Sequence, residues 1–197
     1  MVTLDEPLPE AVLALPVERP DGEPCALRDV LQPPAVLVVL RHFGCVGCDQ
    51  QVVNLRPHLS MLAELGFSVV MVGNGAPEHA RWFADRHHLP ARGVTLVTDP
   101  SHTVHDAMGL VRSVWSSFGP RGLLGWARAI GRGYRQGGFL GDGRQQGGAL
   151  VLDPRGVVRF LHRSTAIGHD PDAADLGRHA LRVAAASARN AGHREIV

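Results

Sequence analysis

The sequence predicts one α/β domain over residues 1–197, built on a central mixed sheet with flanking helices. Three observations predict it. Short apolar runs rich in Val and Leu alternate with segments of helical periodicity, which is typical of strand-helix-strand units. Two further strand-like runs are separated only by a tight turn, which adds an antiparallel hairpin. The chain has 197 residues, 45% of them hydrophobic, and is long enough to bury one core.

Five apolar runs predict the strands, at residues 35–40, 67–72, 94–97, 149–152 and 156–161. The first two are apolar almost throughout, which is typical of strands buried on both faces. The last two flank the turn sequence Asp153-Pro154-Arg155-Gly156 and form the hairpin.

Helices are predicted at residues 45–65, 77–87, 102–108 and 173–188. Pro57 lies inside the first helix and should kink it, and Gly66 should end it. Asp99 is placed to cap the third helix. Residues 1–26 are expected to form an irregular lead-in, in which one short strand after residue 16 is an alternative, and residues 190–197 a frayed tail.

Residues 111–148 do not fit this alternation and are predicted to be an insertion, made of one helix and a Gly-rich loop. Leu123, Ala127, Ile130 and Tyr134 recur at helical spacing. Five arginines and no acidic residue lie in the first part of the insertion: Arg112, Arg121, Arg128, Arg132 and Arg135. This basic stretch is either a solvated helix face or a surface for an anionic ligand, partner or membrane. The Gly-rich run at 137–148 fits neither a P-loop nor a dinucleotide-binding fingerprint.

Composition limits the classes of function. The formal net charge of +1 argues against nucleic acid as a partner, since nucleic-acid binders carry a clear basic excess. Residues 1–9 have no signal-peptide pattern, and no apolar run is long enough to span a bilayer, so we expect a cytoplasmic protein. The basic residues other than His are all Arg, which suggests a GC-rich bacterial genome.

The chemistry-bearing motif is Cys45-Val46-Gly47-Cys48, which follows a buried strand and opens a helix. Backbone N–H groups and the dipole at a helix N-terminus stabilise an anion, so the pKa of Cys45 should fall. Cys48 lies on the same helical face, with its Cα about 5 to 6 Å from that of Cys45, which suits a disulfide. We therefore predict that Cys45 is the nucleophile and that Cys48, more shielded, resolves the product.

A zinc site is the main alternative for this motif, but zinc needs about four ligands. The sequence has no second cysteine pair, and His42 and His58 match no familiar zinc spacing. We expect no metal and no cofactor. Cys25, alone in its segment, is expected to be a buried bystander.

Other polar residues have two interpretations each. His42 either assists the thiol, as a cation or as a proton acceptor, or is a structural histidine at a strand end. Arg41 is expected to extend to solvent. His162 and His169 flank Arg163, and a structural role is favoured over metal binding.

The segment Arg41-His42-Phe43-Gly44-Cys45-Val46-Gly47-Cys48, followed by residues 141–148 (GDGRQQGG), resembles the peroxiredoxin-like proteins of the AhpC/TSA type, a group that includes antioxidant-domain proteins and relatives of selenoprotein U. The resemblance covers roughly residues 27–181. It implies a thioredoxin-like fold with a peroxiredoxin-type insertion, and it implies that Cys45 and Cys48 are the redox pair.

The sequence also departs from the standard family patterns. A standard peroxiredoxin carries Pro-x-x-x-Thr-x-x-Cys, where this chain has Val38 and His42 at the Pro and Thr positions. The usual arginine should fall near Gly147, and Arg144 or Arg163 could substitute for it. The Trp-Cys-Gly-Pro-Cys run of thioredoxin is absent, and Gly148 precedes the hairpin strand where thioredoxin has a cis-proline.

The predicted function is a thiol-dependent oxidoreductase that reduces hydroperoxides or related small oxidants through a Cys45/Cys48 dithiol-disulfide cycle. Electrons would come from a thioredoxin-like protein or a low-molecular-weight thiol. Two alternatives stay open: general thiol-disulfide exchange, and a non-catalytic binding module that keeps the fold. The sequence also leaves open whether the chain works as a monomer or a homodimer.

Purified, reduced protein is expected to hold no stoichiometric zinc or iron, because one cysteine pair cannot complete a closed site. Elemental analysis checks this. One tightly held metal per chain that is lost in a Cys48→Ser variant would overturn the redox interpretation.

Overall fold

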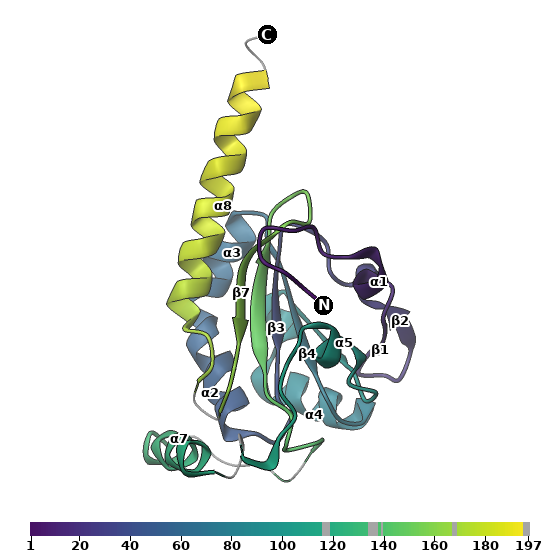
Figure 1. Ribbon diagram of the computed structural model, residues 1–197, viewed down its shortest axis with the longest axis vertical. Helices are drawn as coiled ribbons and strands as arrows, with labels where there is room; N and C mark the ends of the chain where they lie inside the picture. The colour runs from purple at the N-terminus through teal and green to yellow at the C-terminus, as the bar shows by residue number, and fades with distance from the viewer. Residues whose placement is uncertain (116–118, 134–137, 139, 167–168, 195–197) are drawn as a thin grey trace.

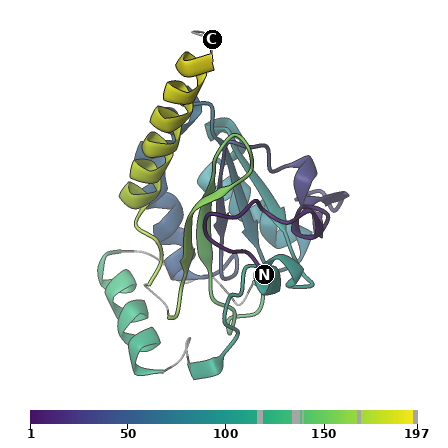
Figure 2. The same ribbon diagram turned by 45° about the horizontal axis from the view of Figure 1, so that its top comes forward.

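The computed structural model describes residues 1–115, 119–133, 138, 140–166 and 169–194. One seven-stranded mixed sheet runs through it in the order β2-β1-β5-β4-β3-β6-β7. Helices cover both faces of the sheet, and α7 lies at one end of the molecule (Figures 1 and 2). The predicted α/β architecture, a central mixed sheet with flanking helices, is confirmed.

The strands are β1 (Pro16–Glu18), β2 (Pro24–Ala26), β3 (Ala35–Val39), β4 (Ser68–Gly73), β5 (Val94–Thr98), β6 (Gly148–Leu152) and β7 (Val158–Arg163). The described helices are α1 (Glu10–Leu13), α2 (Val46–Leu55), α3 (Leu59–Glu64), α4 (Pro77–His87), α5 (Thr103–Ala107), α7 (Pro120–Gly131) and α8 (Ala173–Arg194). Short 3-10 turns are η1 (Leu27–Asp29), η2 (Arg56–His58) and η3 (Pro90–Arg92). The five predicted strands and the predicted helices are all present, with ends shifted by a few residues.

Strand β3 is the centre of the fold, because it pairs in parallel with β4 and antiparallel with β6. Its side chains alternate between two cores. Val36 and Val38 pack under α2, α3, α4 and α8, whereas Leu37 and Val39 pack under the N-terminal segment and α5. All five β3 residues are buried, which confirms the prediction of a strand buried on both faces.

The helix that follows β3 is broken where proline predicts it. Helix α2 ends at Leu55, the 3-10 turn η2 contains Pro57, and α3 continues to Glu64. Gly66 adopts a φ of +77°, as expected for a glycine that ends a helix.

Two predictions about the chain ends are wrong. Residues 1–26 are not irregular, because β1 and β2 form a hairpin that extends the sheet through a contact between Glu18 and Thr98. Pro16 and Pro24 concealed these strands, although a short edge strand tolerates proline. The helical conformation of α8 continues to Arg194, so residues 190–194 are not frayed. Residues 195–197 lie outside the described residues.

The insertion contains the predicted helix as α7. Of the residues at helical spacing, Leu123, Ala127 and Ile130 lie on it, while Tyr134 falls outside the described residues. Arg135 of the basic stretch also falls outside them.

Asp99 is a buried carboxylate that organises the segment after β5. It accepts hydrogen bonds from the backbone N–H groups of Thr103, Val104 and His105 and from the His105 ring. The other His105 ring nitrogen donates to the Leu40 carbonyl over 3.0 Å. The predicted cap is confirmed, and through His105 it also fixes the end of β3.

Replacing Asp99 with Asn should lower the free energy of unfolding by about 2 to 4 kcal/mol, because the amide NH2 would face hydrogen-bond donors in a buried site. Burial raises the pKa of Asp99, but the hydrogen bond and charge of His105 and the backbone N–H groups lower it below its ordinary value. The stabilisation is therefore present above about pH 4 and lost as the pH falls through the lower folded-state pKa. Urea unfolding at several pH values measures both effects.

The matched control is Asp106→Asn, an exposed carboxylate on the same helix α5. It should change the free energy of unfolding by no more than about 0.5 kcal/mol. Equal losses in the two variants would contradict the role given to Asp99.

Candidate active site

The structure brings the two predicted cysteines together at the start of α2. Cys45 is the N-cap residue of α2, and Cys48 lies in the first helical turn. Both are free thiols, and both are buried, with exposed fractions of 3% and 2%. The expected difference in shielding between the two thiols is therefore small, because the core covers both residues.

The two thiols differ in the direction in which their pKa is shifted. The pKa of Cys45 is lowered to about 7, chiefly because the Cys48 thiol hydrogen-bonds to its sulfur; burial opposes this shift and the Arg41 charge assists it. The pKa of Cys48 is raised well above its usual value by burial and by that same hydrogen bond. Of the two thiols, Cys45 is thus the one that ionises at the lower pH.

The expected cause contributes to this shift but is not the largest one. The backbone N–H of Cys48, in the first turn of α2, lowers the pKa of Cys45 as predicted. The hydrogen bond from the Cys48 thiol and the charge of Arg41, neither of which was expected, lower it more.

Arg41 does not extend to solvent as predicted: its exposed fraction is 1%. It lies two residues after the buried strand β3, in a segment that stays buried from Leu40 to Cys48. Its Nη2 donates to the Gly143 carbonyl over 3.0 Å, and its backbone N–H donates to the Cys48 Sγ over 3.2 Å. A buried cation therefore lies beside the cysteine pair.

The loop at residues 140–147 encloses Arg41. Phe43 donates its backbone N–H to the Leu140 carbonyl over 3.1 Å. A Cβ on Gly147 would lie 2.5 Å from the Val39 carbonyl oxygen, so only glycine allows this approach. The two sequence motifs of the family resemblance thus form one site.

Asn74, at the end of β4, joins the two loops and was missed by the sequence analysis. Its side-chain amide donates to the Arg41 carbonyl, and its Oδ1 accepts from the Asp142 backbone N–H over 2.5 Å. Asn74 is fully buried. A lone Asn after a strand carries no sequence signal for such a contact.

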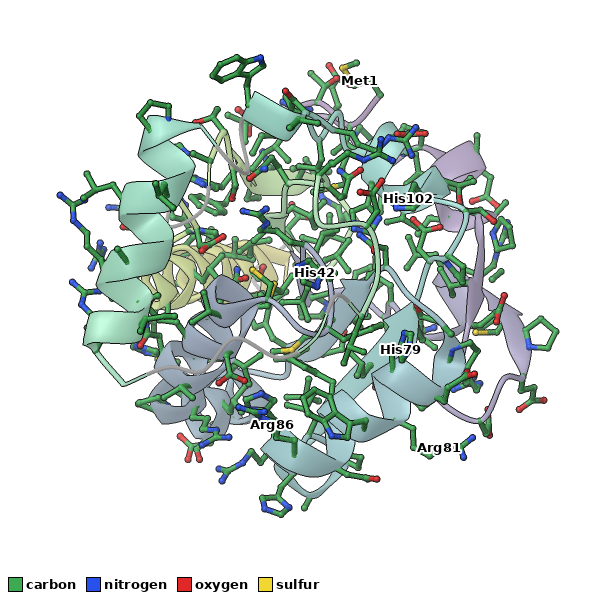
Figure 3. The ribbon with its side chains drawn as sticks, turned by 90° about the horizontal axis from the view of Figure 1, so that it is seen from below. Met1, His42, His79, Arg81, Arg86 and His102 are labelled. Atoms are coloured by element: carbon green, nitrogen blue, oxygen red, sulfur yellow. The ribbon has the colours of Figure 1, made fainter. Side chains whose placement is uncertain are left out.

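His42 is buried near the centre of the end of the molecule shown in Figure 3. Burial and the Arg41 charge lower its pKa to about 4, so it is neutral at neutral pH. Its Nδ1 accepts a hydrogen bond from the Gly44 backbone N–H over 3.2 Å. A histidine cation that stabilises the thiolate is therefore disfavoured, and two interpretations stay: a neutral ring that accepts a proton, and a structural histidine.

Asp170, before α8, is a second residue that the sequence analysis did not select. Burial raises its pKa, and the charges of Arg41, His162 and His169 oppose that shift. Its negative charge raises the pKa of both Cys45 and Cys48. The thiol pair is therefore set between a cation and a carboxyl group.

His162 and His169 form a local contact, in which the His162 Nε2 donates to the His169 carbonyl over 2.8 Å. Within the described part of the chain, no cluster of three His, Cys, Asp or Glu residues could hold a metal ion. Cys25 lies on β2, half-buried, and burial raises the pKa of its thiol.

Comparison with known proteins identifies the family. A model of the AhpC/TSA antioxidant enzymes matches residues 54–166, more than half of the chain. The chain belongs to the AhpC/TSA antioxidant enzyme family. The matched span begins after Cys48, so it assigns no role to either thiol.

Two curated proteins are similar to the chain in sequence. The chain is 27% identical to the chloroplastic thioredoxin-like protein AAED1 of Arabidopsis thaliana over 151 residues, covering 72% of this chain and 60% of that protein. It is 28% identical to peroxiredoxin-like 2C of Homo sapiens over 181 residues, covering 84% of this chain and 77% of the relative. The chain thus spans under two thirds of the plant protein's length.

Solved structures confirm the thioredoxin-like fold. The Xanthomonas campestris bacterioferritin comigratory protein, described for its alkyl peroxide reduction, matches with a TM-score of 0.64 and 16% identity over 92% of this chain and 99% of its own. Peroxiredoxin Q of the same organism matches with a TM-score of 0.63 and 17% identity over 91% and 97%. At 16% and 17% identity these likenesses show the fold alone, whereas the family model shows membership of the AhpC/TSA antioxidant enzymes.

Neither arginine suggested as a substitute for the family arginine reaches the thiols. Arg144 is exposed and pairs with Asp142. Arg163 donates to the carbonyls of Met108 and Val2, next to the N-terminal core. Arg41 is the arginine whose charge acts on Cys45.

Alkylation should report the hydrogen bond between the thiols. In a Cys25→Ser background, the rate of Cys45 alkylation by iodoacetamide should rise with a midpoint near pH 7, because only the thiolate reacts. Cys48→Ala removes the donor and should raise this midpoint, whereas Cys48→Ser keeps a hydroxyl donor and should raise it less. Mass spectrometry of the labelled peptides gives the rates. An unchanged midpoint in Cys48→Ala would rule out the thiol hydrogen bond as the main cause.

Proposed function

We propose that the protein is a thiol peroxidase in which Cys45 attacks a hydroperoxide and Cys48 resolves the product. The observation that carries this proposal is the opposite shift of the two thiol pKa values within one helical turn. A nucleophile needs to be a thiolate near neutral pH, and a resolving thiol needs to keep its proton until the first step is complete.

The proposed reaction has two chemical steps. The Cys45 thiolate attacks the terminal oxygen of the hydroperoxide, the O–O bond breaks, and the alkoxide takes up a proton and leaves as an alcohol. Cys45 is oxidised to a sulfenic acid. Cys48 then loses its proton and attacks the Cys45 sulfur, which forms the disulfide and releases water. A thioredoxin-like protein or a low-molecular-weight thiol supplies the two electrons that restore the dithiol.

Arg41 supplies the positive charge for the first step in this proposal. His42 stands at the Thr position of standard peroxiredoxins, and their arginine should fall near Gly147, where this chain has none. A buried guanidinium in a site closed to water stabilises both the thiolate and the negative charge that develops on the leaving oxygen. Because β3 and the loop at 140–147 hold Arg41 in place, little reorganisation is needed during the reaction.

Burial favours a small oxidant over a protein disulfide. The exposed fractions of Cys45 and Cys48 are 3% and 2%, and attack on a protein disulfide requires two sulfurs to meet in line. A hydroperoxide needs only a narrow approach. General thiol-disulfide exchange is therefore the second candidate. A cytoplasmic location, which would keep both thiols reduced between turnovers, belongs to the same proposal.

The two cysteine variants should fail at different steps. Cys45→Ser is expected to abolish turnover with every substrate, because no other thiolate lies at the site. Cys48→Ser should still react with hydrogen peroxide once and then accumulate a Cys45 sulfenic acid, which dimedone traps. Excess peroxide should convert it to the sulfinic form. Mass spectrometry of the trapped peptide identifies each product.

Cys25→Ser is the matched control, since Cys25 lies on β2 and should leave turnover unchanged. Near-normal turnover in Cys45→Ser, or first labelling of Cys48 after mild oxidation, would reverse the assignment of nucleophile and resolver. If neither thiol reacts faster than free cysteine, the chain is a binding module and the peroxidase proposal is wrong.

A further inference from the structure

A surface of exposed apolar side chains lies on the insertion. Ten large hydrophobic residues are exposed in the described chain, and six of them fall between positions 111 and 130: Val111, Val114, Trp115, Leu123, Leu124 and Ile130. The indole of Trp115 is 81% exposed and the side chain of Leu123 is 60% exposed. Scattered exposed apolar residues need no explanation, but a concentration of this kind marks an interaction surface.

The same segment is positively charged. Arg112, Arg128 and Arg132 are exposed and make no ion pair with any described residue. Residues 107–141 contain five arginines and no acidic residue. We call these three arginines and the six apolar residues the insertion patch.

The insertion patch lies at the end of the molecule that carries the cysteine pair. Helix α7 packs against α2, whose first turn holds the thiols, and Figure 3 shows α7 along the border of the end that holds His42. The first residues of the patch are tied to the loop around Arg41: Ser113 donates its N–H to the Arg144 carbonyl, and Gln146 donates to the Val111 carbonyl.

We propose that the insertion patch binds the surface of an anionic lipid bilayer. A helix that mixes exposed Leu, Ile and Arg, next to an exposed Trp, has the composition of helices that lie in a membrane interface. Apolar side chains enter the acyl boundary, Trp prefers the headgroup level, and Arg extends to lipid phosphates. None of the described helices has the length and apolar character needed to span a bilayer.

A second copy of the chain is a poorer occupant. Symmetric contact between two copies would place the arginines of both patches against each other, and the segment has no carboxylate to compensate. An anionic lipid surface provides that compensation along the whole patch. Such docking would bring Cys45 next to hydroperoxides of membrane lipids. That use of the patch rests on the proposed peroxidase function, whereas membrane binding does not depend on it.

Vesicle flotation with the full-length protein tests the docking. We expect the protein to float with phosphatidylcholine vesicles that contain about one third phosphatidylglycerol, and not with phosphatidylcholine alone. A basic residue near an anionic surface strengthens binding about fivefold, so Arg128→Glu/Arg132→Glu should weaken it by at least about 25-fold. Trp115→Ser/Leu123→Ser should also weaken it, and circular dichroism checks that each variant is folded.

The matched control is Arg182→Glu/Arg189→Glu, two exposed arginines on α8, which extends away from α7 (Figure 1). It makes the same change in net charge and should bind as the wild type does. Cys45→Ser should also bind normally, which separates failure of docking from failure of the peroxidase proposal.

Three outcomes would overturn the proposal. The first is wild-type protein that floats with neither vesicle or equally with both. The second is an equal loss in the α8 control. The third is a dimer that sedimentation detects in the wild type and not in the patch variants, without vesicle binding, which would assign the patch to a second copy.

Discussion

The buried positive charge of Arg41 is the constraint on which the site depends. Placing a guanidinium in a core costs several kcal/mol unless acceptors surround it, so the chain has to bring backbone carbonyls to this point. The Gly143 carbonyl does so from the loop at 140–147, and Asn74 fixes that loop by bonding both to it and to the backbone of Arg41. The glycines of the loop are required because Gly147 packs directly on the carbonyl of Val39.

The charges around the cysteine pair follow from this arrangement. Arg41 adds to two shifts: it lowers the pKa of Cys45 together with the hydrogen bond from the Cys48 thiol, and it lowers the pKa of His42 together with burial. The charge of Asp170 raises the pKa of Cys45 and so opposes Arg41. Burial and the hydrogen bond that Cys48 makes to Cys45 keep the Cys48 thiol protonated. The two thiols are almost equally buried, so the proposed division of labour between them rests on electrostatics and not on a difference in access.

The features that the sequence predicts correctly are those determined by residues close together in the chain. Apolar runs identified β3 and β4, and Pro57 identified the break after α2, because periodicity and proline act within a few residues. The cysteine pair was likewise visible from spacing alone. The contacts of Arg41 with Gly143 and of Asn74 with Asp142 join residues 102 and 68 positions apart, so no local pattern could report them. The edge strands β1 and β2 were missed because proline penalises an inner strand and not a short edge strand.

The insertion links the surface of the molecule to its buried site. Its first part carries the exposed apolar and basic residues, and its last part, the loop at 140–147, holds Arg41. The two parts are directly bonded, since Arg112 pairs with Gln145 in an antiparallel bridge flanked by the bonds of Ser113 and Gln146. These bonds hold residues 111–113, where the patch begins, against the loop that contacts Arg41. The insertion therefore supplies a carbonyl acceptor to the cation beside Cys45 and, in the docking proposal, part of the surface on which a large ligand would lie.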